Sequence, residues 1–217
     1  MTCCCSGFCG AAEQQFTAEK AGKELQRYRS KGPIATTRLL RDGLADGGLI
    51  TGTLLDIGAG IGALTCELLE RGMSEAVAVD ASAAYLAAAR ALADGRAVSD
   101  RIRFVHADFL QSAHDLPSAT VVTLDRVVCC YPLYQPLLEQ ALGRAVRGFA
   151  ISYPRDRWYV RALMWLENAR RRRTCGFRTF VHPPALMERI IREAGFERVS
   201  RRFTFAWTAD VFARRSQ

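Results

Sequence analysis

Short apolar runs alternate with longer segments of helical periodicity along most of the chain. The runs predict buried strands near residues 53–57, 76–80, 102–106, 120–124 and 148–152. The longer segments predict helices near residues 61–71, 82–93, 136–145 and 156–172. Strands that alternate with helices in this way are typical of an α/β protein with a mainly parallel sheet and right-handed crossover connections.

The segment before the first strand does not follow this alternation. Residues 11–29 and 34–45 favour helix and are separated by Gly32-Pro33, so they predict two helices that lie outside the sheet. The 217 residues suit one α/β domain with a modest extension. We therefore expect a Cys-rich start and helical cover over residues 1–49, and the α/β domain over residues 50–217.

The last part of the chain also changes character. A helix over residues 184–194 should end at Gly195, because glycine is the preferred residue just after a helix. The remaining Phe196–Arg214 should form a hairpin of two strands. Five alternating units followed by a terminal hairpin therefore describe the expected sheet.

A glycine turn and a carboxylate follow the first two predicted strands. Residues 54–62 read Leu-Leu-Asp-Ile-Gly-Ala-Gly-Ile-Gly, and Asp80 ends the next apolar run. Such a turn and acid at neighbouring strand ends hold a nucleoside on an open α/β sheet, so a cofactor that carries adenosine is the first inference. A nicotinamide or flavin dinucleotide is the competing ligand, because Gly58, Gly60 and Ala63 also fit its spacing.

These motifs resemble the class I S-adenosylmethionine-dependent methyltransferases over roughly residues 50–214. The resemblance rests on Asp56-Ile-Gly-Ala-Gly-Ile-Gly62, Val79-Asp80 and Val105-His-Ala-Asp-Phe109. It implies a Rossmann-like, mainly parallel seven-stranded sheet with an antiparallel hairpin at the C-terminus and a helical cover at the N-terminus. It also implies S-adenosylmethionine as cofactor. Asp56 favours this donor over a dinucleotide, because a pyrophosphate avoids a neighbouring carboxylate whereas a sulfonium tolerates one.

The resemblance assigns roles to the cofactor residues. Asp80 is expected to accept hydrogen bonds from both ribose hydroxyls, and Asp108 from the adenine amino group. Asp56 should support the loop near the positive end of the cofactor, and Phe109 should pack on the adenine. Close approach of the backbone is expected at the three glycines of the loop, Gly58, Gly60 and Gly62. Taken singly, each aspartate could instead be only a helix N-cap.

The acceptor should lie beyond the fourth strand, because ligands of this fold bind outside the carboxyl ends of the strands. The nearest candidates are Asp125, Cys129, Cys130, Tyr131 and Tyr134, with Asp125 and Tyr131 as catalytic candidates. The alternative is that the segment begins a buried helix in which the cysteines act as small apolar side chains.

Further candidates come from the segments on either side. Arginines bind carboxylates in a planar, bidentate way, so Arg155, Arg157 and Arg178 could recognise an anionic acceptor. His182 is a candidate general base, although a single histidine is more often structural. We expect the helical cover to close over the pocket and to contribute Tyr28 or Arg29.

The helical cover, the Tyr-Pro after strand four and the Arg-rich insertion are most similar to small-molecule O-methyltransferases. A faint similarity to the magnesium-protoporphyrin O-methyltransferases implies a carboxylate acceptor. The chain departs from them at Cys129-Cys130-Tyr131, where that family has a His-Tyr stretch. We therefore expect O-methylation of an anionic or aromatic small molecule.

Charge and cysteine content leave two alternatives open. The net charge of +8 is concentrated in Arg-rich stretches after residue 155, which could serve an RNA methyltransferase, although no RNA-binding module is recognisable. Four of the eight cysteines, Cys3, Cys4, Cys5 and Cys9, lack the paired spacing of a zinc site, so no metal is assigned, and the sequence leaves open whether they bind a metal or metalloid. A thiol or metalloid methyltransferase that uses the cysteines is the other alternative.

The chain also shows no sequence signal for a membrane or for export. No run approaches the 18 or so apolar residues of a membrane span. Met1–Gly10 lacks the basic and apolar regions of a signal peptide. We therefore expect a cytoplasmic enzyme, and the sequence leaves its oligomeric state undetermined.

Overall fold

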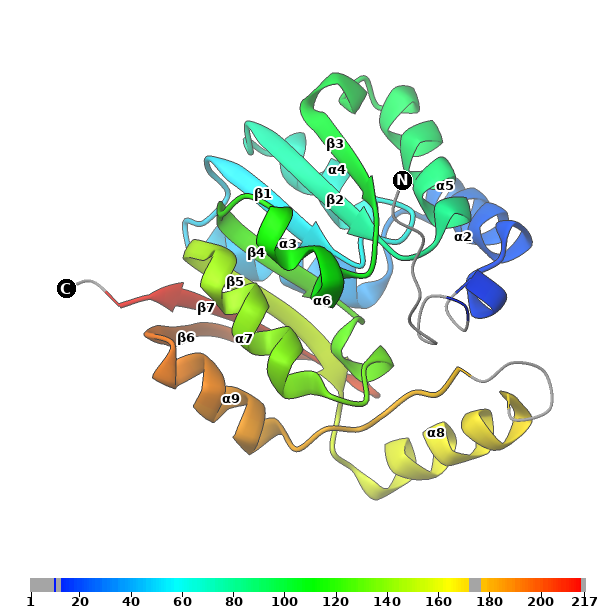
Figure 1. The fold of residues 1–217 in the computed structure, drawn as a ribbon, viewed down its shortest axis with the longest axis vertical. Coiled ribbons are helices and arrows are strands. Elements are labelled where there is room, and N and C mark those ends of the chain that lie inside the picture. The colour runs from blue at the N-terminus through cyan, green and yellow to red at the C-terminus, as the bar shows by residue number, and fades with distance from the viewer. Residues whose placement is uncertain (1–9, 11–12, 172–176, 216–217) are drawn as a thin grey trace.

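A seven-stranded sheet forms the centre of the protein in the computed structural model, which describes residues 10, 13–171 and 177–215 (Figure 1). The strands are β1 (Thr53–Ile57), β2 (Glu75–Asp80), β3 (Ile102–His106), β4 (Ala119–Asp125), β5 (Ala145–Pro154), β6 (Phe196–Phe203) and β7 (Trp207–Arg214). Their order across the sheet is β3-β2-β1-β4-β5-β7-β6. The first five strands pair in parallel, and β7 is antiparallel to both β5 and β6. The predicted α/β class, sheet and terminal hairpin are confirmed.

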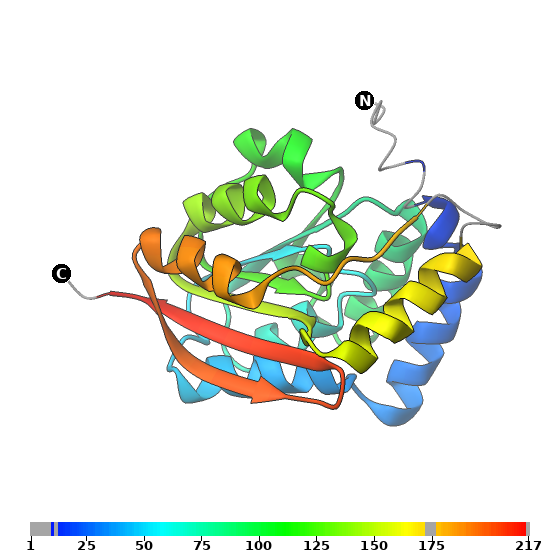
Figure 2. The ribbon, with the colours of Figure 1, turned by 90° about the horizontal axis from the view of Figure 1, so that it is seen from below.

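Helices cover both faces of the sheet, as Figure 2 shows. They are α2 (Ala18–Lys31), α3 (Ala35–Asp46), α4 (Ala63–Leu69), α5 (Ala83–Gly95), α6 (Phe109–Ser112), α7 (Tyr134–Arg144), α8 (Trp158–Arg171) and α9 (Pro184–Glu193). The described residues also contain three short 3-10 helices, η1 (Ser99–Arg101), η2 (Ala113–Asp115) and η3 (Val128–Cys130).

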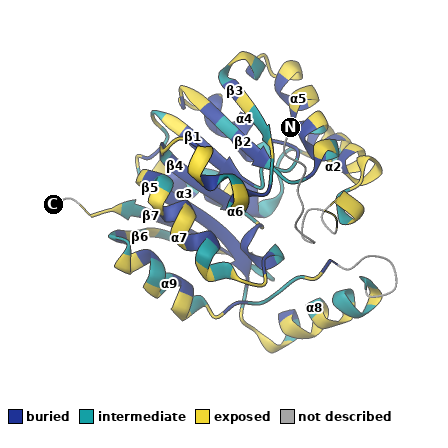
Figure 3. Cartoon of the chain, in the orientation of Figure 1, coloured by how far each residue is buried: buried dark blue, intermediate teal, exposed yellow. Residues whose placement is uncertain are grey.

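The inner strands of the sheet contribute to two separate hydrophobic cores because their side chains alternate between its faces. Leu54 belongs to the core under α2 to α5, and its neighbour Leu55 belongs to the core under α6, α7 and α9. A strand that is buried on both faces has apolar residues at consecutive positions. This burial explains the continuous apolar runs in the sequence, and the dark strands at the centre of Figure 3 illustrate it.

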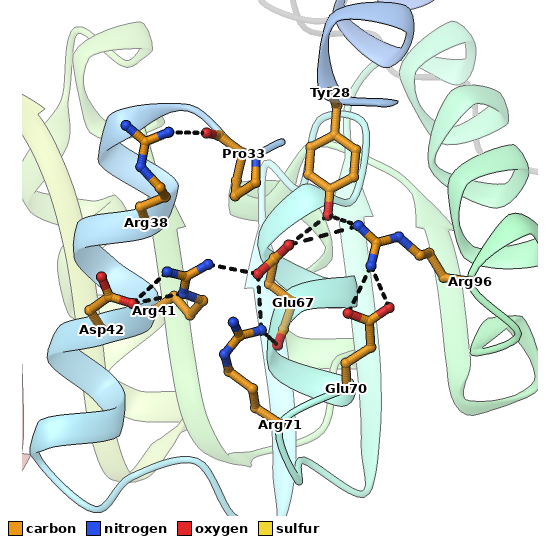
Figure 4. A network of polar contacts seen from close by, with 9 residues as sticks. All are labelled: Tyr28, Pro33, Arg38, Arg41, Asp42, Glu67, Glu70, Arg71 and Arg96. Carbon is orange, nitrogen blue, oxygen red and sulfur yellow. Dashed lines mark hydrogen bonds and ion pairs between the residues drawn. The ribbon is translucent and has the colours of Figure 1, made fainter. Parts of the chain in front are cut away.

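The helical cover is tied to the domain through Glu67 on α4 (Figure 4). The Glu67 carboxylate accepts hydrogen bonds from the Tyr28 hydroxyl at 2.8 Å, from Arg41 at 2.9 Å and from Arg71 at 3.0 Å. Arg96, in turn, donates to the Tyr28 oxygen at 3.0 Å. Burial alone would raise the pKa of Glu67, but these hydrogen bonds and positive charges outweigh burial and hold its pKa below the ordinary value.

Helix α8 is the least buried of the long helices. Val160 is its one buried residue among those described, and Figure 1 shows the helix beyond the carboxyl ends of the parallel strands. Among the described residues, no helix is long and apolar enough to cross a membrane.

Candidate active site

A cavity of about 620 Å³ opens at the carboxyl ends of the parallel strands. Its walls come from the glycine loop after β1, the ends of β2 and β4, and the inner sides of α2 and α8. The volume falls within the range of small-molecule sites. The position is also the one expected for ligands of open α/β sheets, because strand ends and helix starts point their free backbone groups there.

The glycine loop runs along one wall of this cavity. Gly58 has φ +64°, and a Cβ at this position would lie 2.5 Å from Cγ2 of Val127, so only glycine fits. Gly60 has φ +58°, and its N–H donates to Oδ2 of Asp80 at 2.8 Å. Gly62, with φ +72°, precedes the first residue of α4. The positive φ angles of the three glycines thus set the shape of the loop, and Gly58 and Gly60 present their backbone to the cavity.

Asp80 lies at the end of β2 and lines the cavity. Its Oδ1 accepts the Ser82 N–H at 2.8 Å, and its Oδ2 accepts the Gly60 N–H. Burial raises its pKa, although both N–H groups counteract this rise. Because an ionised carboxylate has about four acceptor positions, Asp80 retains capacity for ligand hydroxyls.

Asp56 lines the same wall but is only 1% exposed. Its Oδ2 accepts the Thr65 hydroxyl at 2.6 Å, and its Oδ1 accepts the Thr123 hydroxyl at 2.7 Å. Burial raises the pKa of Asp56 to about 6, with smaller contributions from the negative charges of Asp125 and Asp80. Asp56 therefore joins β1 to α4 and β4, and places a titratable carboxyl beneath the loop.

Asp108 lies outside the cavity lining, although its neighbour Phe109 belongs to it. Asp108 caps α6 by accepting the Leu110 N–H at 3.1 Å, and it also accepts the Tyr131 hydroxyl at 2.9 Å. It is not among the lining residues, whereas Phe109 and Tyr131 are. Burial and the Asp108 charge raise the pKa of Tyr131 far above its ordinary value, so this phenol stays protonated. The adenine contact of Asp108 stays a prediction.

The acceptor side of the cavity contains Asp125 at the end of β4. The Thr37 hydroxyl donates to its Oδ2 and the Ser152 hydroxyl to its Oδ1, both at 2.6 Å. The predicted Cys129 and Cys130 also line the cavity, with their sulfur atoms 4.0 Å apart. Both cysteines belong to η3 rather than to a longer helix.

Seven predicted acceptor residues lie outside the lining. The His182 ring Nε2 is 2.9 Å from the Tyr131 carbonyl and 3.1 Å from the Val128 carbonyl, and Tyr134 packs on the same ring. Burial lowers the pKa of His182. Arg155 donates to the Thr204 carbonyl. The remaining four residues outside the lining are Tyr28 in the Glu67 network and the exposed Arg29, Arg157 and Arg178.

The structure brings in residues that sequence analysis missed. Arg126 has φ +64°, donates its backbone N–H to Ser152, and places its guanidinium 5.0 Å from the centre of the Trp207 ring. Arg171 of α8 lies over the Phe177 ring at 5.9 Å. All four of these cationic and aromatic side chains line the cavity. The predicted hairpin could have indicated Trp207. A hairpin that is antiparallel to β5 places its turn at the carboxyl ends of the parallel strands, and Trp207 follows that turn.

The cover contributes to the cavity through side chains of α2 other than the predicted Tyr28 and Arg29. Lys20, Glu24 and Arg27 line the cavity, whereas Tyr28 does not. The Glu24 carboxylate accepts the Tyr85 hydroxyl at 2.9 Å. The expected closure by the N-terminal helices therefore has a structural counterpart, with different side chains.

The candidate metal ligands at the start of the chain, Cys3, Cys4, Cys5 and Cys9, lie outside the described residues. Within the part of the chain that the structure describes, no group of three or more His, Cys, Asp or Glu side chains could hold a metal ion.

Comparison with known proteins agrees with this geometry. Residues 54–150 match the methyltransferase domain family. No curated protein matches the chain in sequence. A similar solved structure is magnesium protoporphyrin IX methyltransferase from Synechocystis PCC 6803 with bound SAH, at 16% identity and a TM-score of 0.72, covering 93% of this chain and 98% of that chain.

Two further solved structures share the fold. An O-methyltransferase family protein from Burkholderia thailandensis is 18% identical with a TM-score of 0.67, covering 93% of this chain and 63% of that one. Human N-acetylserotonin methyltransferase in complex with SAM is 17% identical with a TM-score of 0.63, covering 93% and 57%.

The domain match over residues 54–150, the fold and the glycine loop together support a class I S-adenosylmethionine-dependent methyltransferase. S-adenosylmethionine is accordingly its methyl donor. The resemblance noted from the motifs is thus confirmed at the level of fold, enzyme class and cofactor.

Proposed function

We propose that this enzyme methylates an oxygen of an anionic or aromatic small molecule. The observation that carries the proposal is that two unlike groups of residues line one cavity, and we name them the donor wall and the acceptor wall. The donor wall comprises the glycine loop and Asp80, and the acceptor wall comprises the cations and rings of Arg126, Arg171 and Trp207. A carboxylate or phenolate attached to a planar body complements the acceptor wall.

The donor wall fits S-adenosylmethionine. The retained acceptor capacity of Asp80 suits the ribose hydroxyls, and the positive φ of Gly58 and Gly60 lets the loop present its backbone along the cavity. Phe109 offers a flat apolar surface for the adenine. The cofactor supplies a methyl group already activated by its sulfonium.

The chain's own contribution is mainly alignment and exclusion of water. A carboxylate acceptor needs no general base, because it is already ionised at neutral pH. For a hydroxyl acceptor, Asp125 is the best-placed proton acceptor, since Thr37 and Ser152 orient its carboxylate in the cavity. His182 and Tyr131 are not assigned proton transfer in this proposal.

Donor binding is tested by titration calorimetry with S-adenosylmethionine. We expect Asp80→Ala to weaken binding by more than about tenfold, because hydrogen bonds to a charged group are lost. Asp115→Asn, at a carboxyl that is 74% exposed, is the control and should bind normally. Tight binding of a nicotinamide dinucleotide in place of the methyl donor would contradict the proposal.

Acceptor chemistry is tested by transfer of labelled methyl to pairs of aromatic acids and their amides. Label that mild base releases as methanol is a carboxyl ester, and base-stable label is an ether, amine or thioether. We expect Arg126→Gln to raise the KM for the acid about tenfold by removing a charge-assisted hydrogen bond. Arg155→Gln, outside the lining, should leave KM unchanged. Equal use of acids and amides would contradict an anionic acceptor.

The cysteines support a second candidate, methylation of a thiol or metalloid acceptor. Cys129 and Cys130 line the acceptor side of the cavity with their sulfur atoms 4.0 Å apart, a spacing at which both could contact one thiophilic atom. The double variant Cys129→Ser/Cys130→Ser distinguishes the two functions. If the enzyme methylates oxygen, this variant should still methylate carboxylates. If the enzyme methylates a thiol or metalloid, the variant should lose methyl transfer to trivalent arsenic.

A further inference from the structure

Helix α8 exposes large apolar side chains on one side. Trp158, Trp165 and Leu166 are 81%, 72% and 56% exposed, and their spacing places them with Arg161 on one stripe of the helix. Large apolar side chains exposed singly are normal in soluble proteins, but a contiguous group marks an interaction site.

The other side of α8 is already occupied by the cavity. Val160, Met164, Glu167 and Arg171 follow a helical spacing and line it. The exposed stripe therefore cannot turn inward to bury itself without withdrawing these residues from the site.

The apolar surface continues onto the turn between β6 and β7. Phe205 is 71% exposed, and its ring stacks on Tyr159 at 4.8 Å, while Tyr159 meets Trp158 edge-on at 5.9 Å. Phe203, at the end of β6, is 54% exposed. We name the following group the α8 patch: Trp158, Trp165, Leu166, Phe203 and Phe205.

Positive charge surrounds the α8 patch. Residues 155–171 contain five arginines against the two acids Asp156 and Glu167. Arg157 and Arg170 are exposed beside the patch. A second copy of this chain would bring the same cations against one another, whereas a negatively charged surface would neutralise them. Tryptophan and arginine together are typical of helices that lie in the headgroup region of a bilayer.

We propose that the α8 patch docks the protein on the surface of an anionic lipid bilayer, with α8 lying between that surface and the cavity. The aromatic rings enter the interface, and the arginines contact lipid phosphates while their aliphatic stems lie along the apolar groups. This docking is independent of the acceptor assigned above, because no residue of the α8 patch lines the cavity.

The test is co-sedimentation of the full chain with vesicles of phosphatidylcholine alone, or of phosphatidylcholine with an equal part of phosphatidylglycerol, at low salt. We expect binding to the anionic vesicles only, with a blue shift of tryptophan emission. The variant Trp158→Ser/Trp165→Ser should lose more than about tenfold in partitioning. Arg157→Gln/Arg170→Gln should lose about fivefold per arginine.

Controls keep the outcomes distinct. Val146→Ser removes another exposed apolar side chain, 51% exposed, at the opposite end of β5 from the α8 patch, and should bind vesicles normally. All variants should retain their affinity for S-adenosylmethionine, so a failure of the proposed function would appear separately in calorimetry.

Three results would overturn the docking proposal. The first is absence of binding to anionic vesicles, or equal binding to neutral ones. The second is an equal loss in Val146→Ser. The third is a dimer in sedimentation velocity without lipid that Trp158→Ser/Trp165→Ser dissociates, since a second copy would then cover the α8 patch.

Discussion

The buried carboxyl of Asp56 should make the stability of this protein depend on pH in a defined direction. Burial raises its pKa from 3.8 to about 6, because only two hydroxyl groups replace the water that the carboxylate loses. The folded protein therefore retains a proton up to about pH 6 that the unfolded chain releases near 3.8. Stability from this group falls as pH rises through that interval and stays low above it.

The size of the effect follows from the pKa shift. A rise of about two units corresponds to about 3 kcal/mol of lost stability at neutral pH. Asp56→Asn keeps the shape of the side chain but cannot ionise. We expect this variant to match the wild type near pH 4 and to exceed it in unfolding free energy by about 3 kcal/mol at pH 7.5.

Urea unfolding followed by circular dichroism at both pH values measures this difference. Asp115→Asn is the matched control at an exposed carboxyl and should show no such divergence. A difference between Asp56→Asn and wild type that is the same at pH 4 and pH 7.5 would refute the reasoning. If the carboxylate also faces the sulfonium, the variant should lose more affinity for S-adenosylmethionine than for its uncharged demethylated product.

Three other predictions concern the cover, the loop and the histidine. Tyr28→Phe should reduce the free energy of unfolding by about 1–2 kcal/mol, because Glu67 loses a buried hydrogen bond from the phenol. Calorimetry should show unchanged affinity for S-adenosylmethionine, because Tyr28 does not line the cavity. Gly58→Ala should weaken donor binding more than about tenfold through its 2.5 Å clash, whereas Gly143→Ala, with open space around it, should not. Because burial lowers the pKa of His182, the contribution of this side chain to stability should fall as pH falls below 6.5, opposite in sign to that of Asp56, and His182→Gln should remove this contribution without changing the pH profile of methyl transfer.

Donor-side features could be predicted from sequence because they are local. A strand, a glycine turn and an acid at the next strand end are each encoded within a few residues, and parallel pairing brings consecutive strand ends to one edge. Asp80 and Gly60 therefore lie at the same edge, where the structure joins them by a hydrogen bond. The exception is Asp108, whose carboxylate caps its own helix and accepts from Tyr131, a contact that no local pattern predicts.

The acceptor side depended on the tertiary structure. Arg126, Arg171 and Trp207 come from three separate segments, and only their packing places them in one cavity. The arginines that sequence analysis favoured point elsewhere, because the orientation of α8 and the strand ends decides which side chains reach the cavity. The sequence alone determined the alternating α/β pattern, the C-terminal hairpin and the glycine loop that binds the methyl donor, since these features depend on periodicity and short-range geometry. The acceptor wall and the outward α8 patch were decided by long-range packing, which periodicity does not encode.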